Sequence, residues 1–256
     1  MLTRLLLLAL LLVCNAGAAA YSAFSDGESF RYRVSWGMFP NAGEIHVSAH
    51  RETFKDRPVF RIRMVTSTKG MVRRLYSYED TAEALIDIET GKLISATERV
   101  DKGDKSINST TQFDYGSRLA IHRDIARPGR NVDIPIPEGS PTDLLSALIG
   151  ARHWGAQPGE KRSALIFAGR DIYPVNIYAD SYERIDYQKK QIDALLLLPK
   201  MEDQPPRGIF RRGGEIRVWL AKDGEKLPVR MQLKLNFGTA HLVLIEHKVS
   251  LTTAAR

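Results

Sequence analysis

The sequence predicts an all-β fold with mainly antiparallel strands, and three observations carry this prediction. Apolar and polar residues alternate over long stretches, turn sequences separate these stretches, and only one segment has helical spacing. Strict alternation places one face of a strand on a core and the other in water, as in antiparallel sheets. We therefore expect a curved meander sheet or a partly open β-barrel.

The alternation is clearest in stretches near the two ends of the chain. They are residues 30–36, 45–50, 60–64 and 229–237. Short polar turns that contain glycine lie between the strands, at residues 89–92, 115–117, 168–171 and 222–225. Such connections join neighbouring antiparallel strands. The continuous apolar run Ala194–Leu198 suits a strand buried on both faces.

One segment has the pattern of an amphipathic helix, over about residues 141–154. Ser140 is a capping residue, Pro141 suits the first helical position, and Asp143 follows three residues after the cap. The apolar stripe consists of Leu144, Ala147, Leu148, Ala151 and Trp154. Gly155 ends the helix. We expect this helix to pack on the concave face of the sheet.

The first twenty residues, Met1–Ala20, have the order of a cleavable secretory signal peptide. Arg4 precedes an apolar run that is too short to span a bilayer, and small residues follow it. We expect removal of residues 1–20, a single β-rich domain over 21–256, a periplasmic location and no transmembrane span in the mature chain. Lipid attachment at Cys14 is not expected, because Val13 stands where a lipobox has a small residue.

The composition restricts both the chemistry and the partners. Cys14 is the only cysteine, so a mature chain without it has no disulfide and no thiolate nucleophile or metal ligand. The formal charge of +7 becomes about +6 without Arg4. A basic surface attracts nucleic acid, anionic lipid or acidic polysaccharide, and export argues against nucleic acid. A solvated charged face is the simpler explanation.

No residue pattern assigns a catalytic or metal site, and we expect no cofactor. His46 and His50 share a strand face but lie about 13 Å apart, too far to bind one ion. His247 falls on an apolar face, where a hydrogen-bonded core histidine is the simpler interpretation. Glu79, Asp80 and Glu83 precede a strand, but with 30 acidic residues a carboxylate pair arises by chance. The sequence also lacks a Gly-x-Ser-x-Gly elbow.

An ordered set of short motifs resembles a family of exported bacterial envelope proteins, domain of unknown function 3108. The matching segments are Gly27–Tyr32, Val34–Gly37, Ala42–Glu44, Thr142–Leu148, Arg152, Pro158–Gly159, Val218–Leu220, Asp223 and Leu227–Val229. The resemblance extends from about Gly27 to Leu244. It implies a β-rich fold and an envelope setting, and it supplies no activity and no catalytic residue.

Four residues are candidates for binding a ligand: Trp36, Arg152, Tyr178 and Trp219. The aromatic residues suit the lining of a concave face, although aromatic residues more often fill a core. Arg152 at a helix end can hold a carboxylate or phosphate, but pairing with a carboxylate of the protein is the simpler expectation.

Export, a β-meander, one amphipathic helix and no chemical motif favour a non-catalytic periplasmic protein. We expect it to bind or carry an apolar or amphiphilic envelope molecule, such as a lipid or a lipid-linked glycan. Two alternatives stay open. One is a scaffold protein that joins an envelope assembly, or binds an anionic polymer, through a basic face or a strand edge. The other is a hydrolase with scattered carboxylates.

Overall fold

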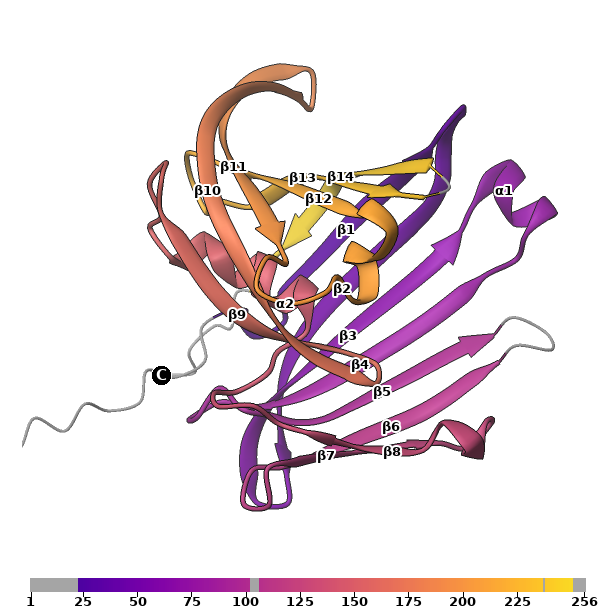
Figure 1. The fold of residues 1–256 in the computed structure, drawn as a ribbon. Helices are drawn as coiled ribbons and strands as arrows, with labels where there is room; N and C mark the ends of the chain where they lie inside the picture. The colour runs from indigo at the N-terminus through magenta and orange to yellow at the C-terminus, as the bar shows by residue number, and fades with distance from the viewer. Residues whose placement is uncertain (1–22, 102–105, 237, 251–256) are drawn as a thin grey trace, which may run out of the picture.

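The computed structural model describes residues 23–101, 106–236 and 238–250, so the predicted signal peptide Met1–Ala20, which includes Cys14, lies outside the described residues. The chain forms one antiparallel sheet of 14 strands that curves around its concave face without closing (Figure 1). The strands are β1 (Ser29–Trp36), β2 (Phe39–Phe54), β3 (Arg57–Thr68), β4 (Glu79–Asp87), β5 (Leu93–Asp101), β6 (Ile107–Asp114), β7 (Leu119–Asp124), β8 (Val132–Pro135), β9 (Lys161–Ala168), β10 (Asp171–Tyr187), β11 (Lys190–Lys200), β12 (Glu215–Ala221), β13 (Pro228–Leu235) and β14 (Gly238–Lys248).

The sheet is a meander whose open seam lies in the middle of the chain. Every strand pairs with its neighbours in sequence, except that β8 and β9 do not pair with each other. The first strand, β1, pairs with the last strand, β14, whereas β8 and β9 form the two edges of the sheet. The expected curved meander, open rather than fully closed, is therefore confirmed.

The alternating stretches form strands with the expected two faces. Phe30 and Tyr32 in β1 are fully buried, whereas Arg31 between them pairs with Glu246 on the outer face. On β3, Arg61 points outward and binds both Glu52 and Glu83. The run around Leu196 is buried at consecutive positions of β11, as predicted for a strand covered on both faces.

The helix of the sequence prediction exists on the concave side, but it begins later than expected. Helix α2 spans Leu144–Gly150 and continues as the 3-10 helix η3 (Ala151–His153). Its cap is Asp143 rather than Ser140: the Asp143 carboxylate accepts a hydrogen bond from the Ser146 N–H at 2.8 Å. The preceding Thr142 is drawn into a β-bridge with Ile166, which keeps the backbone there extended.

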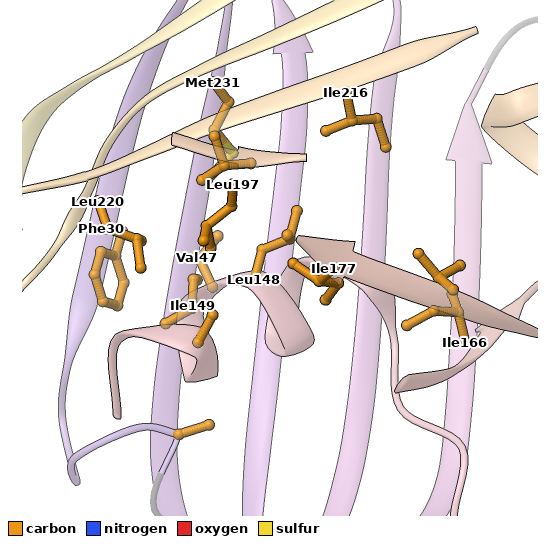
Figure 2. Close-up of a cluster of buried hydrophobic side chains, with 14 of the residues drawn as sticks. Phe30, Val47, Leu148, Ile149, Ile166, Ile177, Leu197, Ile216, Leu220 and Met231 are labelled. Atoms are coloured by element: carbon orange, nitrogen blue, oxygen red, sulfur yellow. The ribbon is translucent and has the colours of Figure 1, made fainter. Parts of the chain in front are cut away.

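Helix α2 lies between two parts of the curved sheet and is buried over a wider arc than the predicted stripe. Leu148 and Ile149 pack among side chains from β1, β2, β10 and β11 (Figure 2). Ile149 is fully buried although it lies outside the predicted stripe. A helix enclosed from two sides has no fully polar face, so the one-sided prediction was too narrow.

Several short helical segments were not predicted. They are α1 (Gly70–Leu75) and the 3-10 helices η2 (Pro128–Arg130) and η4 (Gly208–Gly213). Helix α1 buries no residue, so it lacks the apolar periodicity by which a helix is recognised. In η4 only Phe210 is buried.

Alternate connections of the meander lie at opposite ends of the strands. We call the row of connections at one of these ends the α1 rim, because it includes helix α1 in the β3–β4 connection. The same rim carries the β1–β2 turn at residues 37–38 and the β7–β8 connection at residues 125–131 (Figure 1). The opposite rim carries, among others, the β2–β3 turn at residues 55–56 and the β10–β11 turn at residues 188–189.

Candidate functional site

A cavity of about 260 Å³ lies on the concave face, between the sheet and the beginning of α2. Its apolar lining residues are Val47, Ile62, Met64, Ala82, Ala84, Leu93, Ala96, Leu145 and Phe167. Three of these are alanines on the adjacent strands β4 and β5, where Ala84 pairs with Ala96 and Ala82 with Glu98. Their small side chains leave space that larger residues would fill.

Two carboxylates, Asp80 on β4 and Glu98 on β5, line the polar end of this cavity. Burial raises the pKa of Asp80 to about 6, and the negative charge of Glu98 acts in the same direction. Burial also raises the pKa of Glu98, although Arg127 opposes this shift. Among the described residues neither carboxylate forms an ion pair within 4.0 Å. The cavity therefore offers carboxylate acceptors that form no direct ion pair with any described side chain.

Three buried polar atoms around this cavity have no hydrogen-bond partner in the described part of the chain. They are Asp80 Oδ1, Asp143 Oδ2 and Ser146 Oγ. The cap hydrogen bond of α2 uses Asp143 Oδ1 and leaves Oδ2 unpaired. Buried polar atoms nearly always have a partner, because an unpaired one costs about 1–3 kcal/mol. A ligand or water that donates hydrogen bonds would satisfy these atoms.

A second polar group adjoins the cavity on β6 and β7. The cavity-lining hydroxyl of Thr111 lies 2.9 Å from His122 Nδ1. Burial lowers the pKa of His122, so its imidazole is neutral at neutral pH. The buried Asp124 carboxylate binds the guanidinium of Arg127 at 2.9 Å. This carboxylate is therefore already occupied.

The candidate residue Arg152 lies away from this cavity in a buried ion network at the opposite rim. Its guanidinium donates to both carboxylate oxygens of Glu28, at 2.6 and 2.7 Å, and to the Ala23 carbonyl at 3.0 Å. His247 Nε2 lies 2.8 Å from the same carboxylate. Burial raises the pKa of Glu28, but hydrogen bonds from Arg152, the Ser25 N–H and His247 outweigh it and lower this pKa overall.

Of the two roles expected for Arg152, the structure shows the ion pair with a carboxylate of the protein, that of Glu28. His247 faces inward as a hydrogen-bonded histidine, but simple alternation is not the reason. A register shift in the β1–β14 pairing between Arg31 and Tyr32 brings His247 opposite Phe30. The buried residues nearby on β14 are therefore Leu242 and Leu244, whereas Val243 and Ile245, which are in the same alternation phase as His247, are not buried.

The three aromatic candidates lie on separate strands and not in the cavity lining. Trp36 ends β1 at the α1 rim. Tyr178 on β10 donates a hydrogen bond to Glu202 and lies against the ammonium groups of Lys161 and Lys200.

Trp219 on β12 is buried, and its indole N–H donates to Glu183 at 2.7 Å. The structure therefore does not bring the four candidates together, and a ligand role for them stays a prediction.

Asp80 and Glu98 were not identified from the sequence as a pair of cavity residues. Glu79, Asp80 and Glu83 lie within β4 rather than before a strand, and Asp80 is in the inward phase with Ala82 and Ala84.

Among the described residues, no group of three or more His, Cys, Asp or Glu side chains could hold a metal ion. None of the described helices has the length and hydropathy needed to cross a bilayer.

The raised pKa of Asp80 predicts that this residue costs stability at neutral pH. A carboxyl whose pKa is higher in the folded state binds protons more strongly there, so stability falls as pH rises from about 4 to about 6. We expect Asp80→Asn to increase the free energy of unfolding at pH 7.5 by about 0.5–2 kcal/mol. The gain should shrink toward pH 4, as measured by urea unfolding at both pH values. An equal or lower stability at pH 7.5 would contradict the prediction.

Comparisons with known proteins place the chain in a family but do not assign an activity. A family model described as a protein of unknown function, DUF3108, matches residues 31–245. No curated protein sequence matches the chain. A similar solved structure is a β-barrel-like protein of domain of unknown function DUF1849 from Brucella abortus, with a TM-score of 0.55 and 9% identity. The match covers 90% of this chain and 100% of that one, and at this identity it supports the fold alone.

Proposed function

The chain belongs to the DUF3108 family, proteins of unknown function, and from the geometry of its interior we propose that it binds an amphiphilic molecule in the cavity. The single observation that carries this proposal is the mixed lining: an apolar wall that ends in unpaired acceptors. Binding pockets typically combine a mainly apolar lining with a few polar groups that orient the ligand.

The size of the cavity fits part of an amphiphile. An apolar protein cavity of about 150 Å³ is enough to bind benzene. The present cavity has about 260 Å³, so it accommodates a longer hydrocarbon segment. The alkyl part would contact Val47, Ile62 and Met64, and the head group would lie toward Asp80 and Glu98.

The acidic end selects the head group of the ligand. Asp80 and Glu98 accept hydrogen bonds when ionised, and an anionic head group placed between them would be repelled. An ammonium group or a hydroxyl-rich group supplies the missing donors. We therefore propose a ligand with an amine or polyol head rather than a free carboxylate or phosphate.

The setting that we propose is the periplasm, with an envelope lipid whose head group carries an amine or sugar hydroxyls as the ligand. The sequence of residues 1–20 supports export. The large hydrophobic core supports a fold that is stable without disulfides. A carrier that takes up such a ligand needs no catalytic group.

We expect decylamine to bind in the cavity at pH 7.5 more tightly than decanol, and decanol more tightly than decanoate, by isothermal titration calorimetry. All three probes have the same chain, so the order reports the head group. For decylamine the affinity should fall as pH drops below about 6, because Asp80 then becomes protonated. Decanoate bound as tightly as decylamine would refute the proposed head-group selection.

Filling the cavity provides a matched test of its location. Ala82→Leu adds side-chain volume inside the cavity, and the neighbouring Thr81→Leu changes the other face of β4, outside the cavity lining. We expect Ala82→Leu to weaken decylamine binding about 10-fold or more and Thr81→Leu to leave it unchanged. Equal affinities of both variants and the parent protein would place the ligand elsewhere.

One observation favours the hydrolase alternative, namely the hydrogen bond between the Thr111 hydroxyl and His122. A hydroxyl beside a neutral imidazole is the beginning of a nucleophile–base pair. The orienting carboxylate is missing, because Asp124 is bound to Arg127. Hydrolysis of p-nitrophenyl butyrate that is lost in Thr111→Val would favour the hydrolase over the binding protein.

A further inference from the structure

Exposed apolar side chains are concentrated on the α1 rim. Of the nine large hydrophobic residues that are exposed in the described part of the chain, five lie there: Met38, Met71, Leu75, Tyr76 and Ile125. Met38 is 85% exposed, Leu75 76% and Ile125 74%. Single exposed apolar residues are ordinary, but several at the tips of connections along one rim indicate a contact surface.

The connections that carry these apolar tips contain basic residues and no acidic ones. The three connections at residues 37–38, 69–78 and 125–131 contain Lys69, Arg73, Arg74, Arg127 and Arg130 and no Asp or Glu. Arg127 pairs with Asp124, and Arg73 lies 3.9 Å from Glu79. Lys69, Arg74 and Arg130 form no ion pair with another described residue. We call the five apolar and five basic residues the rim patch.

We propose that the rim patch docks the protein on the surface of a bilayer that contains anionic lipids. The apolar tips would enter the interface between head groups and acyl chains, and the basic side chains would contact anionic head groups. These tips belong to three connections at the same end of the strands, so one flat membrane surface can contact all three (Figure 1).

The spacing of the tips favours a bilayer over a protein partner. Four strands, β4 to β7, lie between α1 and Ile125, which corresponds to about 15–20 Å at the usual strand spacing. A protein partner of ordinary size binds a contiguous, well-packed patch, whereas a bilayer accepts separate insertions.

Docking at this rim also suits the position of the cavity. Asp80 lies near the beginning of β4 and Glu98 near the end of β5, so the polar end of the cavity faces the α1 rim. In the context of the proposed function, a membrane at this rim would lie on the side where the head group of the ligand is held. The docking itself does not depend on the identity of that ligand.

The test is sedimentation of the full chain with vesicles of phosphatidylglycerol and phosphatidylcholine in about equal amounts, compared with phosphatidylcholine alone. Each basic residue near an anionic surface strengthens binding by about fivefold. We therefore expect the triple variant Lys69→Gln, Arg74→Gln, Arg130→Gln to bind the anionic vesicles about 100-fold more weakly. Its charge-matched control replaces Lys55, Lys189 and Lys190 by Gln at the opposite rim and should bind as the parent protein does.

The apolar tips are tested separately. Met71→Ser with Leu75→Ser should weaken vesicle binding at least 10-fold, and Ile245→Ser with Val249→Ser, also exposed, should not change it. All variants share residues 1–20, so a contribution of the leader cancels in each comparison. Equal binding of rim and control variants, equal binding to both vesicle types, or no binding of the parent protein would overturn the proposal.

Cavity binding and vesicle binding are separate measurements. Decylamine binding without vesicle binding would refute the docking surface and leave the proposed function in place. Vesicle binding without decylamine binding would have the opposite meaning.

Discussion

Replacing Arg152 by Met is expected to lower the free energy of unfolding by about 3–5 kcal/mol. The substitution removes the guanidinium that donates to both oxygens of Glu28 and leaves a carboxylate that is 1% exposed without its cation. Urea unfolding at pH 7.5, followed by tryptophan fluorescence, measures the loss. A loss below about 1 kcal/mol would show that the ion pair contributes little to the fold.

A surface pair in the same protein provides the matched control. Arg123 and Asp133 form an ion pair in which both side chains are about half exposed. Exposed pairs typically contribute about 0–1 kcal/mol, so Arg123→Met should change stability by no more than this. The double variant Glu28→Gln, Arg152→Met should be more stable than Arg152→Met alone, because position 28 then carries no buried, unpaired carboxylate.

The same network predicts how the stability difference depends on pH. The pKa of Glu28 lies below its usual value in the folded protein, so its contribution to stability is complete above about pH 4.5 and decreases at lower pH. In Arg152→Met, burial acts on Glu28 without its main partner and raises the pKa. Protonation then relieves the penalty, and we expect the stability gap between parent and variant to narrow as pH falls.

The local structure followed from the sequence where side-chain alternation is strict. Phe30 and Tyr32 on β1 face the core, as their alternation with arginines predicts. The start of α2 did not follow, because Thr142 pairs with Ile166, which comes more than twenty residues later. Likewise, the pairing of β1 with β14 joins the two ends of the described chain, and no local pattern specifies it.

The cavity was not predicted because its signal is distributed over several strands. Asp80 and Glu98 are two among 30 acidic residues, and only the register of β4 and β5 brings them to one wall. A signal does exist: Asp80 occupies the inward phase of an alternating run that continues with Ala82, Ala84 and Ile86. A charged residue followed by small ones in a core-facing phase indicates a space rather than a packed core.

The packing of helix α2 in the interior compensates for the missing closure of the sheet, so we expect a large loss of stability when this packing is disturbed. Strands β8 and β9 do not pair. The strands on either side of this seam are instead linked across the interior by side chains of α2, such as Leu148 and Ile149 (Figure 2). Ile149 is fully buried, and we expect Ile149→Ala to cost about 2–5 kcal/mol in urea unfolding.

An Ile→Ala substitution at an exposed position of the α1 rim provides the control for the loss of buried packing. Ile125 is 74% exposed, so Ile125→Ala removes the same atoms without leaving a hole in the core. We expect its stability to stay within about 0.5 kcal/mol of the parent protein. Similar losses for both variants would mean that α2 does not hold the interior together. A large loss for Ile149→Ala alone would establish that the open seam is stabilised from inside by the helix, which also forms one wall of the cavity.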